Sequence, residues 1–177
     1  MTGSRPVGEL RVDAPTFAAV AEEHLDDVHA YLLYLTGDRS VAEDLTAETF
    51  ERACRRWRRY DPRRGSAKTW LCQLARSTAL DHFRAEQRRR RRETTYALRE
   101  PDEAVEANFG VGLSAALQEG LRSLSAGERE VIALRVILEL DGDSAARLLG
   151  ISPTACSTRL SRALQKLEAK VRDDVFA

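Results

Sequence analysis

The sequence is poor in several residue types that mark common classes of protein. Only 6% of its 177 residues are aromatic, and it has five prolines and one methionine. Its three cysteines are scattered and form no C-x-x-C pair, which argues against a disulfide framework and against a zinc site. The longest apolar stretch, residues 131–140, is interrupted by two charged residues and is far shorter than the roughly 20 residues of a membrane span. We therefore expect no membrane-spanning segment.

Other absences limit the possible activities. Residues 1–15 contain two prolines and lack the apolar segment of a signal peptide, so they are predicted to form a flexible N-terminal arm of a cytoplasmic protein. The sequence has no glycine-rich phosphate loop, nucleophile–base pair or cluster of metal-ligating residues. It therefore predicts no cofactor, no metal and no catalytic residue.

Charge is plentiful but unevenly distributed. The 28 basic and 28 acidic residues give a formal net charge of zero. Residues 52–92, however, contain fifteen Lys/Arg against three Asp/Glu, whereas residues 1–51 contain three basic and eleven acidic residues. A dense cationic surface attracts polyanions, and an acidic surface attracts basic proteins. The distribution predicts a nucleic-acid partner for the central segment.

The pattern of apolar residues indicates helices throughout. Leu, Ala, Arg and Glu are abundant, which favours helix. Apolar residues recur at helical spacing in seven segments: residues 17–36, 40–60, 67–92, 113–124, 126–138, 144–149 and 153–171. We predict an all-α protein with two small helical domains, residues 16–92 and 113–177, joined by a flexible acidic linker at 93–112.

The second predicted helix, 40–60, has one unusual apolar residue. Its apolar stripe includes Phe50, Cys54 and Trp57, while Asp44 and Glu48 lie on the opposite side of the helical wheel. Leu45 falls off the stripe and is predicted to be partly exposed among these carboxylates. This pattern fits either a solvated face with one stray leucine or a surface that binds a partner.

The third predicted helix, 67–92, has two distinct faces. One face is apolar, and the other consists of Thr69, Gln73, Arg76, Leu80, Arg84 and Gln87. Apart from Leu80, these residues carry donors suited to phosphates and base edges. Five adjacent arginines follow at 88–92. Because they repel one another, they are predicted to end the ordered helix unless a polyanion neutralises them. The alternative is a solvated tail without specific contacts.

The C-terminal segment predicts a helix-turn-helix. Ser125 and Glu128 form the S-x-x-E pattern of a capping box, and Ser152 with Pro153 is typical of a helix start. The last helix leaves short polar and basic residues facing outward, as a helix that enters the DNA major groove requires: Thr154, Ala155, Thr158, Arg159, Arg162, Gln165 and Lys166. The alternative is an ordinary helical packing unit with a basic face.

Motifs in both halves resemble one family, the extracytoplasmic-function (ECF) group of sigma-70-type initiation factors. Residues 42–50, AEDLTAETF, look like its core-polymerase-binding motif A-E-D-L-x-Q-E-T-F. Residues 66–71, SAKTWL, with DHFR at 81–84, resemble the promoter-melting and −10-recognition segment of region 2. Residues 125–167, with EREV, LLGIS and RLSRA, are similar to region 4.

The resemblance implies partners and residue roles. Core RNA polymerase would be bound through its β′ clamp helices and β flap, with Asp44, Leu45, Glu48 and Phe50 contacting the clamp helices. The −10 element, with a base of the melted non-template strand held by the loop at 63–67, would be bound by Arg63, Arg64, Ser66, Lys68, Thr69, Gln73, Arg76 and Arg84. The duplex −35 element would be read by Thr154, Ala155, Thr158, Arg159, Arg162 and Lys166. A separate anti-sigma protein is a further partner that the family leads us to expect.

Two departures from the family pattern stand out. Ala47 replaces the usual glutamine of the core-binding motif, which removes one hydrogen-bonding side chain. Residues 141–146, DGDSAA, replace a more bulky Ser-Tyr-x-Glu-Ile-Ala stretch, so region 4 is predicted to have a less filled core.

Three other functions compete with the sigma-factor interpretation. A stand-alone helix-turn-helix repressor or activator would explain residues 113–177 but not the features of the N-terminal half. A nuclease using Asp44, Glu48, Asp81 or His82 is disfavoured, because the last two are predicted to face the core, away from the first two. RNA binding by the arginine run remains a possible side activity.

Overall fold

The computed structural model describes residues 16–96 and 113–175, with side chains for 16–92 and 113–172. Within these ranges the chain is helical and has no strand. The predicted N-terminal arm and most of the predicted linker lie outside the described residues. The elements are α1 (Phe17–Thr36), α2 (Arg39–Arg56), the 3-10 turns η1 (Trp57–Arg59) and η2 (Pro62–Arg64), α3 (Ala67–Tyr96), α4 (Ala115–Ser123), α5 (Ala126–Ile132), the π-helical turn η3 (Ala133–Ile137), α6 (Gly142–Leu149) and α7 (Pro153–Val175).

Helices α1, α2 and α3 form the N-terminal domain. The Thr16 hydroxyl accepts a hydrogen bond from Ala19 N–H and begins α1, as predicted. Gly37 ends the helix at φ 65°, a left-handed conformation that glycine adopts without strain. The three helices pack pairwise on one another around buried residues such as Tyr31 and Leu71.

The buried face of α2 differs from the prediction. Leu45, predicted to be partly exposed, is only 4% exposed, whereas Cys54, predicted to lie on the apolar stripe, is exposed. Packing against both α1 and α3 sets the face, and two threonines can lie on it because their hydroxyls bond within the helix. Thr46 donates to Ala42 O and Thr49 donates to Leu45 O, each at 2.7 Å.

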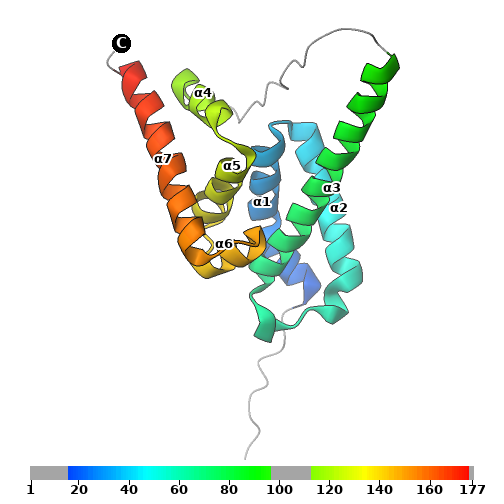
Figure 1. The fold of residues 1–177 in the computed structure, drawn as a ribbon. Helices are drawn as coiled ribbons and strands as arrows, with labels where there is room; N and C mark the ends of the chain where they lie inside the picture. The colour runs from blue at the N-terminus through cyan, green and yellow to red at the C-terminus, as the bar shows by residue number, and fades with distance from the viewer. Residues whose placement is uncertain (1–15, 97–112, 176–177) are drawn as a thin grey trace, which may run out of the picture.

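Helix α3 runs past the five arginines, so the predicted helix end at residue 92 is wrong. The helix continues to Tyr96 and projects beyond the other helices (Figure 1). Successive helical residues point about 100° apart, so of the five arginines only the pairs 88/91, 89/92 and 88/92 share a face. Glu86 also pairs with Arg89 at 2.7 Å, and Arg92 Nε donates to the carbonyl of Arg88. These contacts reduce the repulsion that was expected to end the helix.

Helices α4 to α7 form the C-terminal domain, in which α7 packs on the other three. The capping box of α5 is present: the Ser125 hydroxyl accepts a hydrogen bond from Glu128 N–H, and the Glu128 carboxylate accepts one from Ser125 N–H. Gly150, at φ 67°, makes the turn between α6 and α7. Leu164 of α7 is a large apolar residue but is 43% exposed. The small residues that depart from the family pattern, Ser144, Ala145 and Ala146, are buried.

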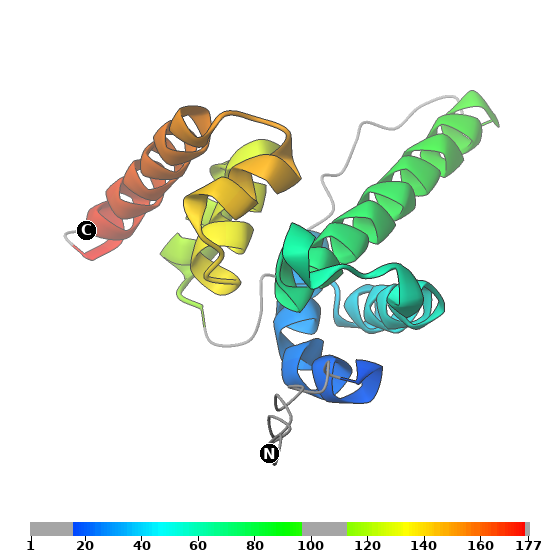
Figure 2. The same cartoon turned by 90° about the horizontal axis from the view of Figure 1, so that it is seen from below.

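The two domains contact each other. Helix α1 lies between α3 and the C-terminal domain, and it packs against η3 (Figures 1 and 2). An ion pair also links the domains, with Arg76 Nε of α3 2.7 Å from Glu130 Oε1 of α5. The structure is therefore a closed arrangement of two helical domains. None of the described helices is long and apolar enough to span a bilayer.

Candidate nucleic-acid and protein interfaces

The acidic surface of α2 retains two of the four predicted polymerase-binding side chains. Asp44 is exposed, and Glu48 is partly exposed and accepts a hydrogen bond from Arg52 at 2.5 Å. Leu45 is in the core, so the expectation of an exposed leucine here is wrong, and Phe50 is half-buried against the core. Of the four predicted polymerase-binding residues, only the carboxylates Asp44 and Glu48 therefore lie at the surface of α2.

Arg52 connects this surface to α3. Its guanidinium lies 3.3 Å from Asp81 Oδ2, in addition to its bond with Glu48. Asp81 was predicted to face the core but is exposed. Across the described residues, no group of three or more His, Cys, Asp or Glu side chains could hold a metal ion.

The loop before α3 is held in shape by aromatic residues. Tyr60 stacks on Trp57 with ring centroids 5.0 Å apart and contacts Trp70 at 5.3 Å. Its hydroxyl donates to the carbonyl of Gly65 at 3.1 Å. No sequence pattern indicated this cluster, although its residues lie on both sides of the loop. The cluster fixes the two ends of the loop.

The predicted −10-binding residues in this loop have local partners. Arg63 and Arg64 are exposed on the turn η2, where Arg63 Nε lies 3.2 Å from Asp61. Ser66 caps α3 as predicted, since its hydroxyl accepts from Thr69 N–H at 3.2 Å. The Ser66 and Thr69 hydroxyls also bond to each other at 3.0 Å. The structure therefore presents two guanidinium groups and two hydroxyls on an ordered turn.

Several predicted −10-binding cations on α3 are paired with carboxylates. Lys68 lies 2.9 Å from Asp27 of α1, and Arg84 lies 3.6 Å from Asp81. Arg76 pairs with Glu130, which belongs to the C-terminal domain. Gln73 is exposed on the same helix. A polyanion bound along α3 must compete with these carboxylates.

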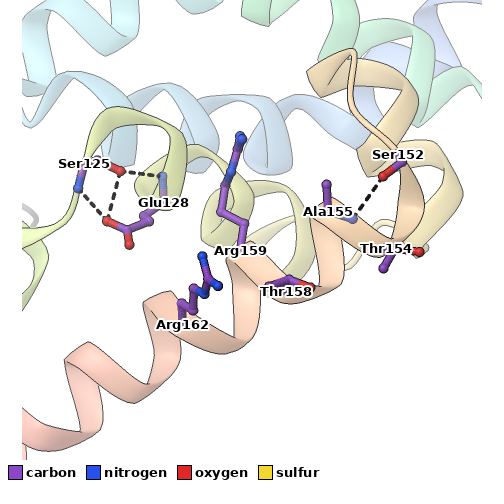
Figure 3. A pocket seen from close by; sticks show the side chains of 8 residues that line it. All are labelled: Ser125, Glu128, Ser152, Thr154, Ala155, Thr158, Arg159 and Arg162. Atoms are coloured by element: carbon purple, nitrogen blue, oxygen red, sulfur yellow. Dashed lines mark hydrogen bonds between the residues drawn. The ribbon is translucent and has the colours of Figure 1, made fainter.

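The predicted −35-binding residues gather around one surface hollow. The hollow has a volume of about 530 Å³ and contains five of the six predicted residues (Figure 3). Its lining consists of Ser125, Glu128, Ser152, Thr154, Ala155, Thr158, Arg159 and Arg162. It lies between the first turn of α5 and the first half of α7, with Arg159 and Arg162 extending from α7 (Figure 3). The hollow has hydrogen-bond donors suited to base edges and phosphates.

The first turn of α5 positions the basic residues of α7. A side-chain Cβ at Gly127 would lie 3.2 Å from Arg159 Nη1, so the guanidinium packs closely over this glycine. Lys166 Nζ lies 2.6 Å from Glu128 Oε1. The sequence indicated Ser125 and Glu128 only as a helix cap, and their part in lining the hollow was missed. The S-x-x-E pattern was the only feature of the sequence that drew attention to these two residues.

The Glu128 carboxylate has a strongly lowered pKa. The hydrogen bond from Lys166, followed by the one from the Ser125 N–H, lowers the pKa of Glu128 to about 2, from an ordinary value of 4.5. The native state thus binds this proton less readily than the unfolded chain. Its stabilising effect is fully present above pH 4.5 and is lost as the pH falls towards 2.

We expect the Glu128→Gln variant to unfold at a lower temperature than the wild type at pH 7. The difference should shrink as the pH falls from about 4.5 towards 2, because the wild-type carboxylate becomes protonated there. Thermal unfolding followed by circular dichroism measures this. Glu119→Gln, which removes an exposed charge on α4, should show little change. A difference between Glu128→Gln and wild type that stays constant over this pH range would contradict the assignment.

Comparison with known proteins identifies the family. Sigma-70 region 2 matches residues 20–89, and Sigma-70, region 4, matches residues 114–167. The ECF RNA polymerase sigma factor SigX of Bacillus subtilis is 30% identical over 163 residues, which cover 86% of this chain and 81% of SigX. The chain belongs to the ECF group of the sigma-70 family. Sigma factors are DNA-binding transcription initiation factors without enzymatic activity of their own.

Other relatives of this sigma factor agree with that assignment. The ECF sigma factor BldN of Streptomyces coelicolor is 30% identical over 168 residues, which cover 92% of this chain, while the chain spans 62% of BldN. The sigma factor RpoE of Bartonella quintana, solved in complex with the anti-sigma factor NepR, superposes with a TM-score of 0.68 at 24% identity. That comparison covers 88% of this chain and 96% of RpoE, and it shows the same fold.

Proposed function

We propose that this sigma factor binds core RNA polymerase, directs it to specific promoters and helps to melt the −10 element. The observation that carries the proposal is the hollow on α7, where five of the six predicted −35-binding residues meet. The loop before α3 and the acidic surface of α2 supply the two other contacts that such a factor needs. All three surfaces are formed by described residues of one chain.

The contact with polymerase is assigned to the carboxylates of α2. Asp44 and Glu48 bind the β′ clamp helices, with Phe50 supporting the helix from inside. Leu45 contributes by packing and not by direct contact. Region 4 binds the β flap. Exposed carboxylates suit a basic protein surface through long-range attraction.

The −10 contact is assigned to the ordered turn and to α3. Pulling a base out of the stack costs a few kcal/mol, which contacts to the extracted base offset. The turn at 63–67 is fixed at both ends by the aromatic cluster, so little conformational entropy is lost when it holds a base. Gln73, Arg76 and Arg84 bind the adjacent phosphates and bases.

A separate anti-sigma protein is proposed as the regulator of this factor. RpoE of Bartonella quintana, which has the same fold, forms a complex with the anti-sigma factor NepR. A protein of that kind would hold this factor inactive by covering its polymerase-binding surfaces.

Run-off transcription tests the proposed function. We expect a transcript from the promoter of the protein's own operon only when this protein and bacterial core polymerase are both present. A fragment with a scrambled −35 element is the matched control and should give little product. Binding of the fragment without polymerase, combined with no transcript, would favour a stand-alone helix-turn-helix regulator instead.

A further inference from the structure

The ion pair between the domains contains Arg76, a residue that is also assigned to DNA binding. Arg76 lies on the face of α3 assigned to the −10 element, yet it is bound by a carboxylate of the C-terminal domain. Arg76 Nε donates to Glu130 Oε1 at 2.7 Å, and Arg76 Nη2 lies 3.4 Å from Glu130 Oε2. The two side chains are only 26% and 17% exposed. A carboxylate that binds a guanidinium through both oxygens resembles a DNA phosphate in charge and geometry.

The other pairs on α3 differ from this one. Lys68 pairs with Asp27, and Arg84 pairs with Asp81, so both pairs lie within the N-terminal domain. Moving the domains apart leaves those pairs intact. Among these pairs, only that of Arg76 with Glu130 depends on how the domains are arranged.

Helix α1, which packs against η3 of the C-terminal domain, carries a buried hydroxyl. Tyr31 of α1 is fully buried, and its hydroxyl has no hydrogen-bond partner among the described residues. Burial raises the pKa of Tyr31 far above its usual range, Glu130 raises it further, and Arg76 lowers it, so both charges of the ion pair act on this hydroxyl. A buried hydroxyl without a partner destabilises the closed arrangement, and access of water would remove that penalty.

We propose that Glu130 holds the two domains closed by occupying Arg76 in place of a DNA phosphate, so that the closed form and −10 binding exclude one another. The part concerning DNA rests on the proposed function. Tyr31 keeps the closed form weak enough to open. Because only open molecules bind DNA, the apparent affinity for DNA equals the intrinsic affinity multiplied by the fraction of open molecules.

The distance between the domains gives a test that does not depend on DNA. Cys54 on α2 is exposed, whereas Cys72 and Cys156 are buried, so a dye pair can be attached at Cys54 and at an introduced Gln165→Cys on α7. In the full-length protein, Glu130→Gln should lower the energy transfer. Glu119→Gln removes an exposed charge from the same domain and should leave the transfer unchanged. Equal transfer in the two variants would overturn the closure.

DNA binding gives the second readout. Glu130→Gln should bind a fluorescent single-stranded −10 oligonucleotide about 5-fold more tightly than Glu119→Gln does. Tyr31→Phe, which removes the unpartnered hydroxyl, should increase energy transfer and weaken binding about 5-fold. If Glu130→Gln opens the domains but DNA affinity does not rise, the competition with DNA is overturned. If wild type and variants fail to bind the oligonucleotide at all, the −10 assignment of the proposed function fails while the distance measurement still decides the closure.

Discussion

Replacing Leu45 with aspartate is expected to unfold the N-terminal domain. Leu45 is 4% exposed on the face of α2 that packs in the three-helix core. Losing a buried leucine and burying a carboxylate without a partner should cost about 4 kcal/mol or more, a large part of the roughly 5–15 kcal/mol by which a domain is stable. Polymerase binding would disappear with the fold. Circular dichroism during heating should show a large loss of helix below 37 °C or a much lower midpoint.

Two other variants of α2 distinguish a loss of folding from a loss of polymerase binding. Ala47→Asp adds the same charge at an exposed position two residues away and should keep the wild-type unfolding midpoint. Asp44→Ala should also remain folded while binding core polymerase more weakly, which a pull-down with purified core enzyme measures. A Leu45→Asp variant that melts like the wild type would show that the leucine does not lie in the core.

Removal of Arg159 and Arg162 is expected to abolish selection of the −35 element without affecting polymerase binding. Both side chains line the hollow of about 530 Å³ and extend from the same part of α7. A good contact of arginine with a base or phosphate is worth about 1–3 kcal/mol. Each alanine variant should therefore lower the affinity of the holoenzyme for promoter DNA about 10-fold, and the double variant should lower it further than either single variant.

The measurement is fluorescence anisotropy of a −35-containing duplex titrated with holoenzyme at fixed salt concentration. Arg172→Ala is the matched control, because Arg172 lies near the C-terminal end of the same helix and pairs with Glu168. It should bind DNA as the wild type does. Loss of core polymerase in the Arg159→Ala or Arg162→Ala holoenzyme, with DNA affinity unchanged, would contradict the assignment of this face.

Features set by neighbouring residues were predictable from the sequence. Thr16 begins α1, and Ser125 with Glu128 caps α5, because an N-cap joins a side chain to a backbone N–H only three residues away. Gly37 ends α1 because a glycine readily adopts the left-handed conformation of that position. Helix-forming composition and apolar spacing likewise predict the all-α fold. The five predicted −35-binding residues that line the hollow share one face of one helix, so their spacing was sufficient to group them.

Features set by packing between distant segments were not predictable. The buried face of α2 is set by packing against α1 and α3 together. A helical wheel that follows the large apolar residues places the buried face elsewhere and leaves Leu45 outside it. The bond between Arg76 and Glu130 joins residues 54 positions apart in different domains, and neither side chain carries a local signal for the other. The π-helical turn at Ala133–Ile137, which contacts α1, likewise has no marker such as proline or glycine.

The continuation of α3 through its arginines has a consequence for the thermodynamics of binding. A helix rises 1.5 Å per residue, so residues 88–92 place five cationic side chains along about 6 Å of axis, a charge density that holds dissolved anions nearby. A polyanion lying along this end releases those anions, and the polyanion releases its own cations. The released ions gain entropy, which favours binding, and this gain becomes smaller as the salt concentration rises. At this end of the molecule, ionic strength and not base sequence would set the strength of binding.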